Sequence, residues 1–176
     1  MQCFNLVDKF DRIIIPYNGI LCLLNENDIK SCLKSAANSL TDTGELIFDF
    51  YYVPEEETEE ILCAEQTRNT DEQNEFENND EYLFTILDET RDIHVYEKEH
   101  PNIDTRRFDV SYVYKIVSDN ETITKKEFAI AQRCIYPGEI NKLCEDSGLS
   151  IKYVYGDFCK APVSCNTDQI VVHCCL

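Results

Sequence analysis

The sequence predicts an α/β fold in which a small, partly parallel sheet is combined with an antiparallel β meander. Two observations carry this prediction. Between Lys9 and Pro54 an apolar strand, a helix and a second apolar strand follow one another, which is the pattern of a βαβ unit. Between residues 92 and 136 the apolar residues instead alternate with polar ones, as is typical of half-buried antiparallel strands.

Length and charge limit the classes of protein to which the chain can belong. Its 176 residues, 43% of them hydrophobic, are enough for one domain with a sizeable core. A net charge of −18 argues against nucleic acid and acidic lipid surfaces as partners, because both are anionic. No apolar run approaches the roughly 20 residues of a membrane-spanning helix, and the first residues lack the pattern of a secretory signal. We expect a cytoplasmic protein.

The ten cysteines do not have the spacing of a metal site. None forms a C-x-x-C pair, and most lie beside apolar neighbours, where free cysteine behaves as a small hydrophobic residue. The three histidines are dispersed and give no metal or triad pattern. We therefore expect reduced, mostly structural thiols and no metal.

The first predicted strand contains three consecutive isoleucines, Ile13–Ile15, a pattern typical of a strand buried on both faces. A helix is predicted to begin after Asn25, which is a suitable N-cap with Asp28 three residues later. "TDTG" at Thr41–Gly44 is predicted to end this helix, and "ELIFDFYYV" reads as a second strand parallel to the first.

The range 55–89 has a different composition, with fourteen acidic residues and a single basic one, Arg68. We expect an acidic, partly disordered insert, above all over Asn69–Asn79, since this stretch has little to bury. The flanking stretches "EEETEEILCAEQ" and "DEYLFTILDET" could each form a helical turn or more.

The alternating stretches "DIHVYEKE", "RRFDVSYVYKIV" and "ETITKKEFAIAQRCIY" predict the antiparallel meander over 92–136, with turn-like residues between them. "PGEINKLCEDSGLS" predicts a helix with Pro137 in its first turn and Gly148 at its C-terminal end. "IKYVYGDF" and "DQIVVHCC" predict two closing strands.

Two patterns, "F-D-x-I-I-x-P-Y-N-x-x-x-x-L-L" followed by a helix and "L-x-x-x-G-x-L-I-F-D-F", resemble the middle of class I S-adenosylmethionine-dependent methyltransferases. "R-C-I-Y-P-G-E-I-x-x-L-x-x-x-S-G-L-x-I-x-x-V-Y-G-D-F" is similar to the end of their small-molecule branch. The resemblance covers nearly all of residues 1–176 except the acidic insert. It implies a Rossmann-like sheet with a parallel core and an antiparallel C-terminal strand, S-adenosylmethionine as cofactor, and methyl transfer to a small molecule.

The chain departs from that family where the cofactor is held. The family has a Gly-rich turn after its first strand, and such turns let the backbone approach a ligand beyond the carboxyl ends of the strands. None of the 5 glycines here forms G-x-G. In the family an acidic residue followed by a methionine often flanks adenine; the resemblance places Met1 at the methionine, and the acidic residue is missing here. We therefore expect the C-terminal portion of a methyltransferase, which alone binds the cofactor weakly or not at all.

The resemblance also implies cofactor-binding residues. Pro16, Tyr17 and Asn18 follow the first strand, at the floor of the family's pocket beside the methyl donor, although they could equally form an ordinary turn. Cys22 stands where the family often has histidine.

Three further residues lie at positions of the family's substrate pocket. Asp49 ends the second strand, and Arg133 and Tyr136 lie between the meander and the last helix. A strand-end anchor is the structural alternative for Asp49, and a salt bridge to the acidic surface is the alternative for Arg133.

Two functions remain open on the sequence: an enzyme, or a non-catalytic methyltransferase-like remnant or regulatory subunit that acts by pairing with another protein. Few residues precede the Ile13–Ile15 strand, so we expect it at the edge of its sheet, and an exposed apolar edge is a template for pairing. The expected partner is a second copy or a complementary chain joined through this edge.

Overall fold

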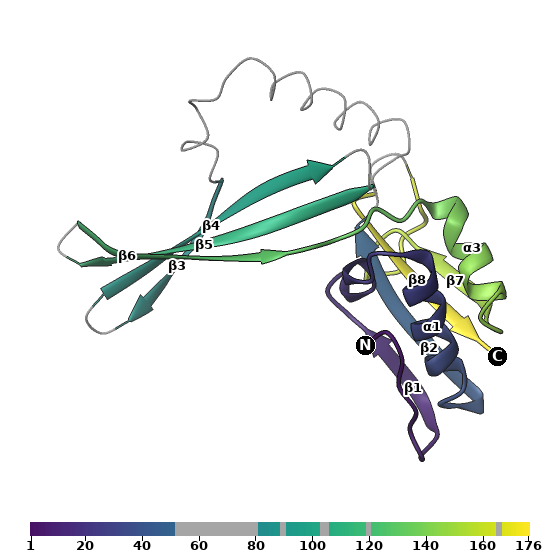
Figure 1. Ribbon diagram of the computed structural model, residues 1–176. Coiled ribbons are helices and arrows are strands. Elements are labelled where there is room, and N and C mark those ends of the chain that lie inside the picture. Colours follow the sequence, from purple (N-terminus) through teal and green to yellow (C-terminus); the bar gives the residue numbers. More distant parts are fainter. Residues whose placement is uncertain (52–80, 89–90, 103–105, 119–120, 165–166) are drawn as a thin grey trace. The chain divides into compact units, whose positions relative to one another are not determined.

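The structure of the protein is a computed structural model that describes residues 1–51, 81–88, 91–102, 106–118, 121–164 and 167–176 (Figure 1). It consists of two units, which are described separately below. Unit 1 comprises Met1–Thr58 and Arg133–Leu176, and unit 2 comprises Glu59–Gln132. The expected disorder of Asn69–Asn79 and the expected helical turn in "EEETEEILCAEQ" lie outside the described residues.

Unit 1 is built on a mixed four-stranded sheet with the order β1-β2-β8-β7. Its strands are β1 (Phe10–Ile15), β2 (Leu40–Tyr51), β8 (Gln169–Cys175) and β7 (Ser150–Tyr155). The β1 and β2 strands are parallel, and the β2–β8 and β8–β7 pairs are antiparallel. The prediction of a parallel core with an antiparallel C-terminal strand is therefore confirmed.

The β2 strand begins earlier than predicted. The predicted turn Thr41–Gly44 lies inside β2, where the register with β1 shifts between Phe10 and Arg12. Helix α1 (Glu26–Ala37) has already ended before this turn, and the turn-like residues lie in the irregular first part of a strand that begins at Leu40.

The two long helices of unit 1 begin where predicted, but α1 ends before the predicted stop at Thr41–Gly44. Helix α1 spans Glu26–Ala37, and the Asn25 side chain caps it by accepting the Asp28 N–H at 2.9 Å. Helix α3 spans Pro137–Glu145, with Gly148 beyond it in the left-handed conformation at φ 79°. A short 3-10 helix, η1 (Gly19–Cys22), joins β1 to α1. No helix within the described ranges is long and apolar enough to cross a membrane.

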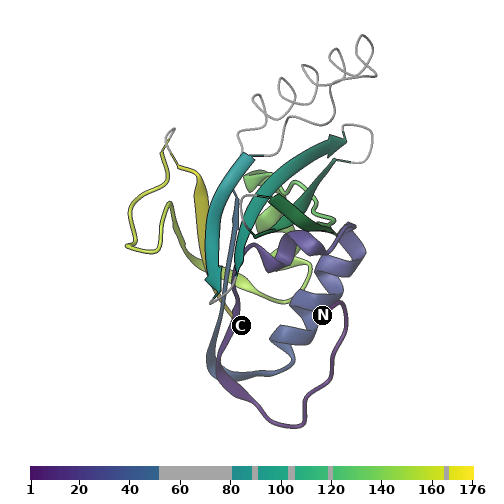
Figure 2. The same ribbon diagram turned by 90° about the vertical axis from the view of Figure 1, so that its left-hand side faces the viewer.

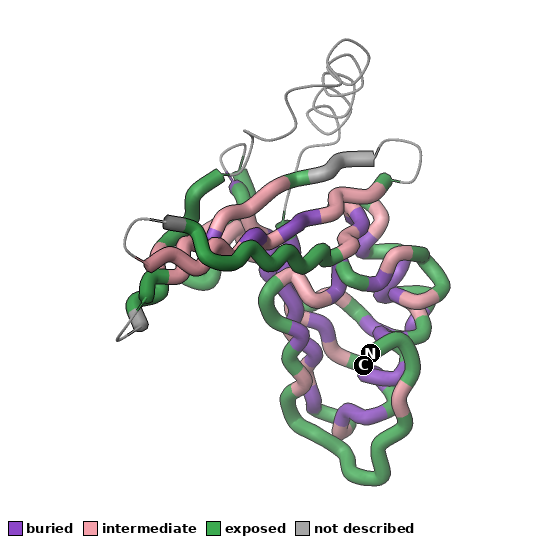
Figure 3. The backbone as a smooth tube through the Cα atoms, turned by 60° about the vertical axis from the view of Figure 1, so that its left-hand side comes forward, coloured by how far each residue is buried: buried purple, intermediate pink, exposed green. Residues whose placement is uncertain are grey.

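The core of unit 1 lies between one face of the sheet and the helices (Figures 2 and 3). Leu46, Phe48 and Phe50 alternate along β2 and are fully buried, as period-two side chains on the inner face must be. Helix α1 covers them with Ile29, Cys32, Leu33 and Ala36, which recur at helical spacing. Burying a side chain of this size stabilises the fold by about 1.5–3 kcal/mol, so the inner face fixes the register of β2.

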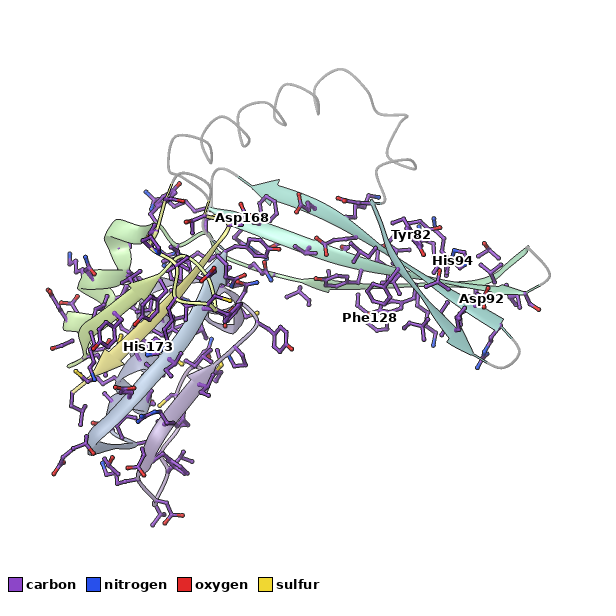
Figure 4. All side chains as sticks on the ribbon, turned by 180° about the vertical axis from the view of Figure 1, so that it is seen from behind. Tyr82, Asp92, His94, Phe128, Asp168 and His173 are labelled. Carbon is purple, nitrogen blue, oxygen red and sulfur yellow. The ribbon has the colours of Figure 1, made fainter. Side chains whose placement is uncertain are left out.

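The β1 strand lies at the edge of the sheet, as predicted, but it is not buried on both faces. Ile15 is 6% exposed and Ile14 is 61% exposed, because no described helix covers the outer face, which is visible from behind in Figure 4. On the same face the rings of Tyr153 and Tyr155 pack against His173, with centroids 6.2 and 5.5 Å from the imidazole. The prediction of a strand buried on both faces is therefore wrong for Ile14.

Unit 2 is an antiparallel meander of sequential strands, β3 (Glu81–Asp88), β4 (Arg91–Asn102), β5 (Arg107–Ser118) and β6 (Glu121–Ile130). The meander was predicted, but it starts earlier, because "DEYLFTILDET" contains the strand β3 and not a helical turn. It also ends earlier, at Ile130, because the range 133–136 belongs to unit 1. Tyr82, Phe84 and Ile86 already have the period-two spacing of a strand.

Candidate functional site

A tight turn follows β1 at the carboxyl end of the parallel strand pair. The Gly19 N–H donates to the Pro16 carbonyl at 3.1 Å, and between them Tyr17 and Asn18 both have positive φ, 58° and 55°. Such a turn normally contains Asn and Gly, and a left-handed residue other than glycine costs about 1–2 kcal/mol. Strain of this kind is concentrated at functional sites.

A buried carboxylate holds this turn in place. Asp49, which is 4% exposed on β2, accepts the Asn18 backbone N–H at 3.1 Å and the Gln169 side-chain amide at 2.8 Å, both through Oδ2. The same Gln169 nitrogen, Nε2, donates to Asn18 Oδ1 at 3.1 Å. The Asn18–Asp49–Gln169 network therefore joins the turn after β1, the end of β2 and the start of β8.

The second oxygen of Asp49 is left open by this network. Within the described parts of the chain no donor bonds to Oδ1. Since none of the described side-chain nitrogens or oxygens is both fully buried and unpaired, Oδ1 is reached by solvent. Asp49 thus anchors the end of its strand, as the structural alternative expected. It also keeps one oxygen open as an acceptor.

Of the other residues placed by resemblance at the cofactor site, Tyr17 is 91% exposed, beside the network. Cys22 is exposed at the end of η1, and Met1 begins a segment whose Gln2 and Phe4 bond to side chains of α1. No hydrogen bond among the described residues links Cys22 or Met1 to Asp49.

Arg133 is tied into the scaffold of unit 1. It is 9% exposed, its backbone N–H donates to the Leu21 carbonyl at 2.8 Å, and its guanidinium bonds to the Glu139 carboxylate at 3.2 and 3.4 Å. Glu139 also accepts the Tyr136 N–H at the start of α3. The expected salt bridge is present, with a helix-capping glutamate as its partner.

Two cavities of unit 1 are lined by residues of these helices and strands. One of about 260 Å³ is lined by Arg133, Glu139, Glu26, Lys142, Gly138 and Leu143. The other, of about 650 Å³, includes Leu40 and Leu176 and so lies at the end of β2 opposite to Asp49. Ligands of open α/β sheets bind beyond the carboxyl ends of the strands, so the larger cavity lies at the wrong edge.

Gln169 is the member of the network that the sequence interpretation missed. It opens β8, and the register places it opposite Tyr51, diagonal to Asp49 on one face of the sheet. A polar residue at the start of an otherwise apolar strand was the available signal for Gln169. Its hydrogen-bond partner could not be predicted, because that depended on which strand pairs with β8.

The described cysteines are all free thiols. Cys144 Sγ and Cys174 Sγ lie 3.6 Å apart in the core, and the hydrogen bond between them, together with burial, raises the pKa of Cys174 above its usual range. No group of three or more metal-binding side chains occurs among the residues that the structure describes.

No protein-family model matches the chain, and no curated protein matches it in sequence. Solved structures are similar in fold. An S-adenosylmethionine-dependent methyltransferase from Clostridium acetobutylicum has a TM-score of 0.71 at 17% identity, over 99% of this chain and 61% of that chain. The CcbJ methyltransferase from Streptomyces caelestis has a TM-score of 0.66 at 14% identity, over 96% and 61% of the two chains.

CalS10, an amino pentose methyltransferase from Micromonospora echinaspora, has a TM-score of 0.65 at 12% identity, over 98% of this chain and 61% of that chain. The chain therefore spans about three fifths of the length of these three structures. At such low identity the likeness concerns the fold, and it extends over nearly the whole chain. The protein has the fold of S-adenosylmethionine-dependent methyltransferases.

Proposed function

We propose that the chain is part of an S-adenosylmethionine-dependent methyltransferase that acts on a small molecule at the carboxyl ends of β1 and β2. The observation that carries this proposal is the strained Tyr17–Asn18 turn, anchored to Asp49 at the edge where α/β sheets bind ligands. The fold of the solved methyltransferases supports it.

The proposed cofactor-binding residues are Pro16, Tyr17 and Asn18, with Cys22 and Met1 as further candidates. The site fits a charged ligand, because Asp49 Oδ1 is an open acceptor and the Asn18 N–H that Asp49 binds directly follows the exposed Tyr17. S-adenosylmethionine supplies an activated methyl group, and the residues of the chain would position the acceptor and exclude water, which is most of what this transfer requires.

Asp49, Arg133 and Tyr136 are the proposed acceptor-side residues. CalS10 acts on an amino pentose, and by that likeness we propose an aminated small molecule as the class of acceptor. Arg133 would contribute through Glu139 and the start of α3, because its guanidinium already bonds to that carboxylate.

The proposal is tested by NMR titration of the ¹⁵N-labelled chain with S-adenosylmethionine up to millimolar concentration. We expect saturable shifts of the Asn18 amide with millimolar affinity, because the Gly turn is lacking and several contacts of about 1–3 kcal/mol each are lost with it. A micromolar dissociation constant would contradict the weak-binding expectation. No saturable shift at any residue would contradict the proposed function.

A further inference from the structure

We infer that Asp49 Oδ1 is the binding point for a cationic group of the ligand, an ammonium or a sulfonium, and that Gln169 is a positioning residue for this carboxylate. The inference deepens the proposed function and rests on it. It is carried by three features of the carboxyl edge: the donors that Asp49 already has, the cation that it lacks, and the strained turn beside it.

The donors of Asp49 are neutral and occupy a single oxygen. The Asn18 N–H and the Gln169 amide both bond to Oδ2, at 3.1 and 2.8 Å. A carboxylate offers about four acceptor positions, so those of Oδ1 remain for a ligand. Because Gln169 also bonds to Asn18 Oδ1 at 3.1 Å, one amide nitrogen fixes the orientation of both side chains.

The negative charge of Asp49 has no cation beside it. Two less buried carboxylates of unit 1 do have one: Glu45 bonds to Lys152 at 2.8 Å and Glu139 to Arg133 at 3.2 Å. Asp49 is more buried than either, yet across the described ranges it forms no ion pair. Burying a carboxylate without a counter-charge is unfavourable, so a cationic ligand would be favoured over a neutral one.

The turn beside Asp49 points to the same chemistry by an independent observation. Tyr17 adopts φ 58° while its side chain is 91% exposed, so packing of the ring does not compensate for the backbone strain. The face of an exposed aromatic ring attracts cations. The Asp49 carboxylate of β2 accepts the N–H of Asn18, the residue that follows Tyr17, so the turn combines a carboxylate and an exposed aromatic residue, the two groups that alkylammonium and sulfonium favour.

The test uses the Gln169 side-chain amide as a local reporter in ¹⁵N NMR spectra, assigned by its loss in Gln169→Leu. S-adenosylmethionine carries a sulfonium and an ammonium, S-adenosylhomocysteine only the ammonium, and methylthioadenosine neither. Glucosamine and glucose form a second pair, which differ in one ammonium group and represent an acceptor. If Asp49 binds the sulfonium, S-adenosylmethionine binds more tightly than S-adenosylhomocysteine. If Asp49 binds the ammonium of the cofactor, S-adenosylhomocysteine binds more tightly than methylthioadenosine.

Asp49→Asn removes the charge and keeps the size of the side chain. We expect it to weaken binding of the cationic probes about tenfold or more and to leave methylthioadenosine and glucose unchanged. The matched control is Asp168→Asn, which removes the same charge from an exposed side chain next to Gln169 (Figure 4). This control should change the affinity less than about twofold, since exposed charges are strongly screened.

Equal binding of charged and uncharged probes by the unmodified chain would overturn the inference, and this comparison needs no variant to fold. Unchanged affinity of a folded Asp49→Asn would also overturn it, and so would an absence of shifts with every cationic probe. If the adenosine compounds fail and glucosamine binds through Asp49, the cofactor assignment fails while the cation site stands. If all three adenosine compounds bind equally and glucosamine does not bind, the cofactor assignment stands while the cation site fails.

Discussion

Arg133 and Asp49 are two buried charged residues of unit 1 that differ in their partners. Arg133 has its countercharge in Glu139 and thereby fastens the start of α3. Asp49 has neutral donors on one oxygen and solvent access on the other. The first arrangement has its counter-charge within the chain, whereas the second keeps an acceptor oxygen open.

Gln169 makes two hydrogen bonds within the network, and their loss should be measurable as stability. Gln169→Leu is expected to lower the free energy of unfolding by about 1–2 kcal/mol, because Asp49 Oδ2 and Asn18 Oδ1 each lose a donor. Urea unfolding followed by circular dichroism checks this, with the exposed Asp168→Asn as the control. Equal unfolding midpoints for Gln169→Leu and the unmodified chain would show that the network contributes nothing.

The thiols should divide into two classes by reactivity. Cys3, Cys22 and Cys159 are exposed, whereas Cys32, Cys144 and Cys174 are buried. Burial raises the pKa of Cys32, and the Cys144 hydrogen bond with burial raises that of Cys174, so neither forms thiolate at pH 8. Among these six, mass spectrometry after a short iodoacetamide treatment should find label on Cys3, Cys22 and Cys159 alone. Early labelling of Cys174 would contradict the packing of β8.

Among the elements, β2 contains the tightest backbone contact around a glycine. A Cβ built on Gly44 would lie 2.8 Å from the Phe10 carbonyl oxygen and 3.0 Å from the Thr41 nitrogen, both backbone atoms that cannot rotate away. The irregular start of β2 thus requires a residue without a side chain, so that β1 can approach.

Gly44→Ala should therefore destabilise the chain by about 1–3 kcal/mol, the usual cost of overpacking. Gly138→Ala is the matched control, since nothing lies within 4 Å of its added Cβ and it is in helix α3. There alanine should leave stability unchanged or raise it by up to about 1 kcal/mol. Thermal unfolding of both variants provides the comparison, and equal effects would contradict the close β1–β2 approach.

Lys30 joins the two helices, because its ammonium bonds to Glu26 of α1 and to Asp146 at the end of α3. The Lys30 hydrogen bond holds the pKa of Asp146 below its ordinary value of 3.8. A lowered pKa means that the stabilisation is present above the ordinary value and is lost as the pH falls through the folded-state value. Lys30→Met should thus shift the urea midpoint slightly at pH 7, and progressively less as the pH falls below the ordinary Asp146 value of 3.8. A shift of equal size at pH 7 and below that value would exclude the ion pairs as its cause.

The sequence sufficed for elements whose signals are local. Asn25 and Gly148 marked the ends of α1 and α3, and the alternating pattern revealed β4 to β6. The strand β3 was predicted as a possible helical turn, because acidic residues dominate the composition of that stretch. Phe84 and Ile86 nevertheless have the spacing of a strand. The Asn18–Asp49–Gln169 network could not be predicted, because Gln169 lies 120 positions from Asp49 and only the pairing of β8 with β2 brings them together.

At the scale of the whole molecule, β1 leaves an apolar edge with Ile14 61% exposed. We propose that a second copy pairs along this edge at high concentration, since unprotected edge strands favour such pairing. Ile14→Lys should abolish the association, because a charge would enter a desolvated contact. Val7→Lys is the control, as Val7 is 99% exposed and lies outside the strand.

Sedimentation velocity at high micromolar concentration measures the effect. We expect a concentration-dependent dimer for the unmodified chain and for Val7→Lys, and a monomer for Ile14→Lys. A monomer in all three cases would rule out pairing through β1.

The order of the strands in unit 1 also has a consequence for synthesis of the chain on the ribosome. Asp49 of β2 and Gln169 of β8 are separated by 120 positions, which at roughly 5–20 residues per second takes about 6–24 s to translate. Throughout that interval β2 has only β1 beside it, while each strand of the meander finds its neighbour as soon as the next hairpin emerges. The nascent chain therefore contains all four strands of the meander before the Asn18–Asp49–Gln169 network can form, and the side of β2 that pairs with β8 stays open until synthesis is nearly complete.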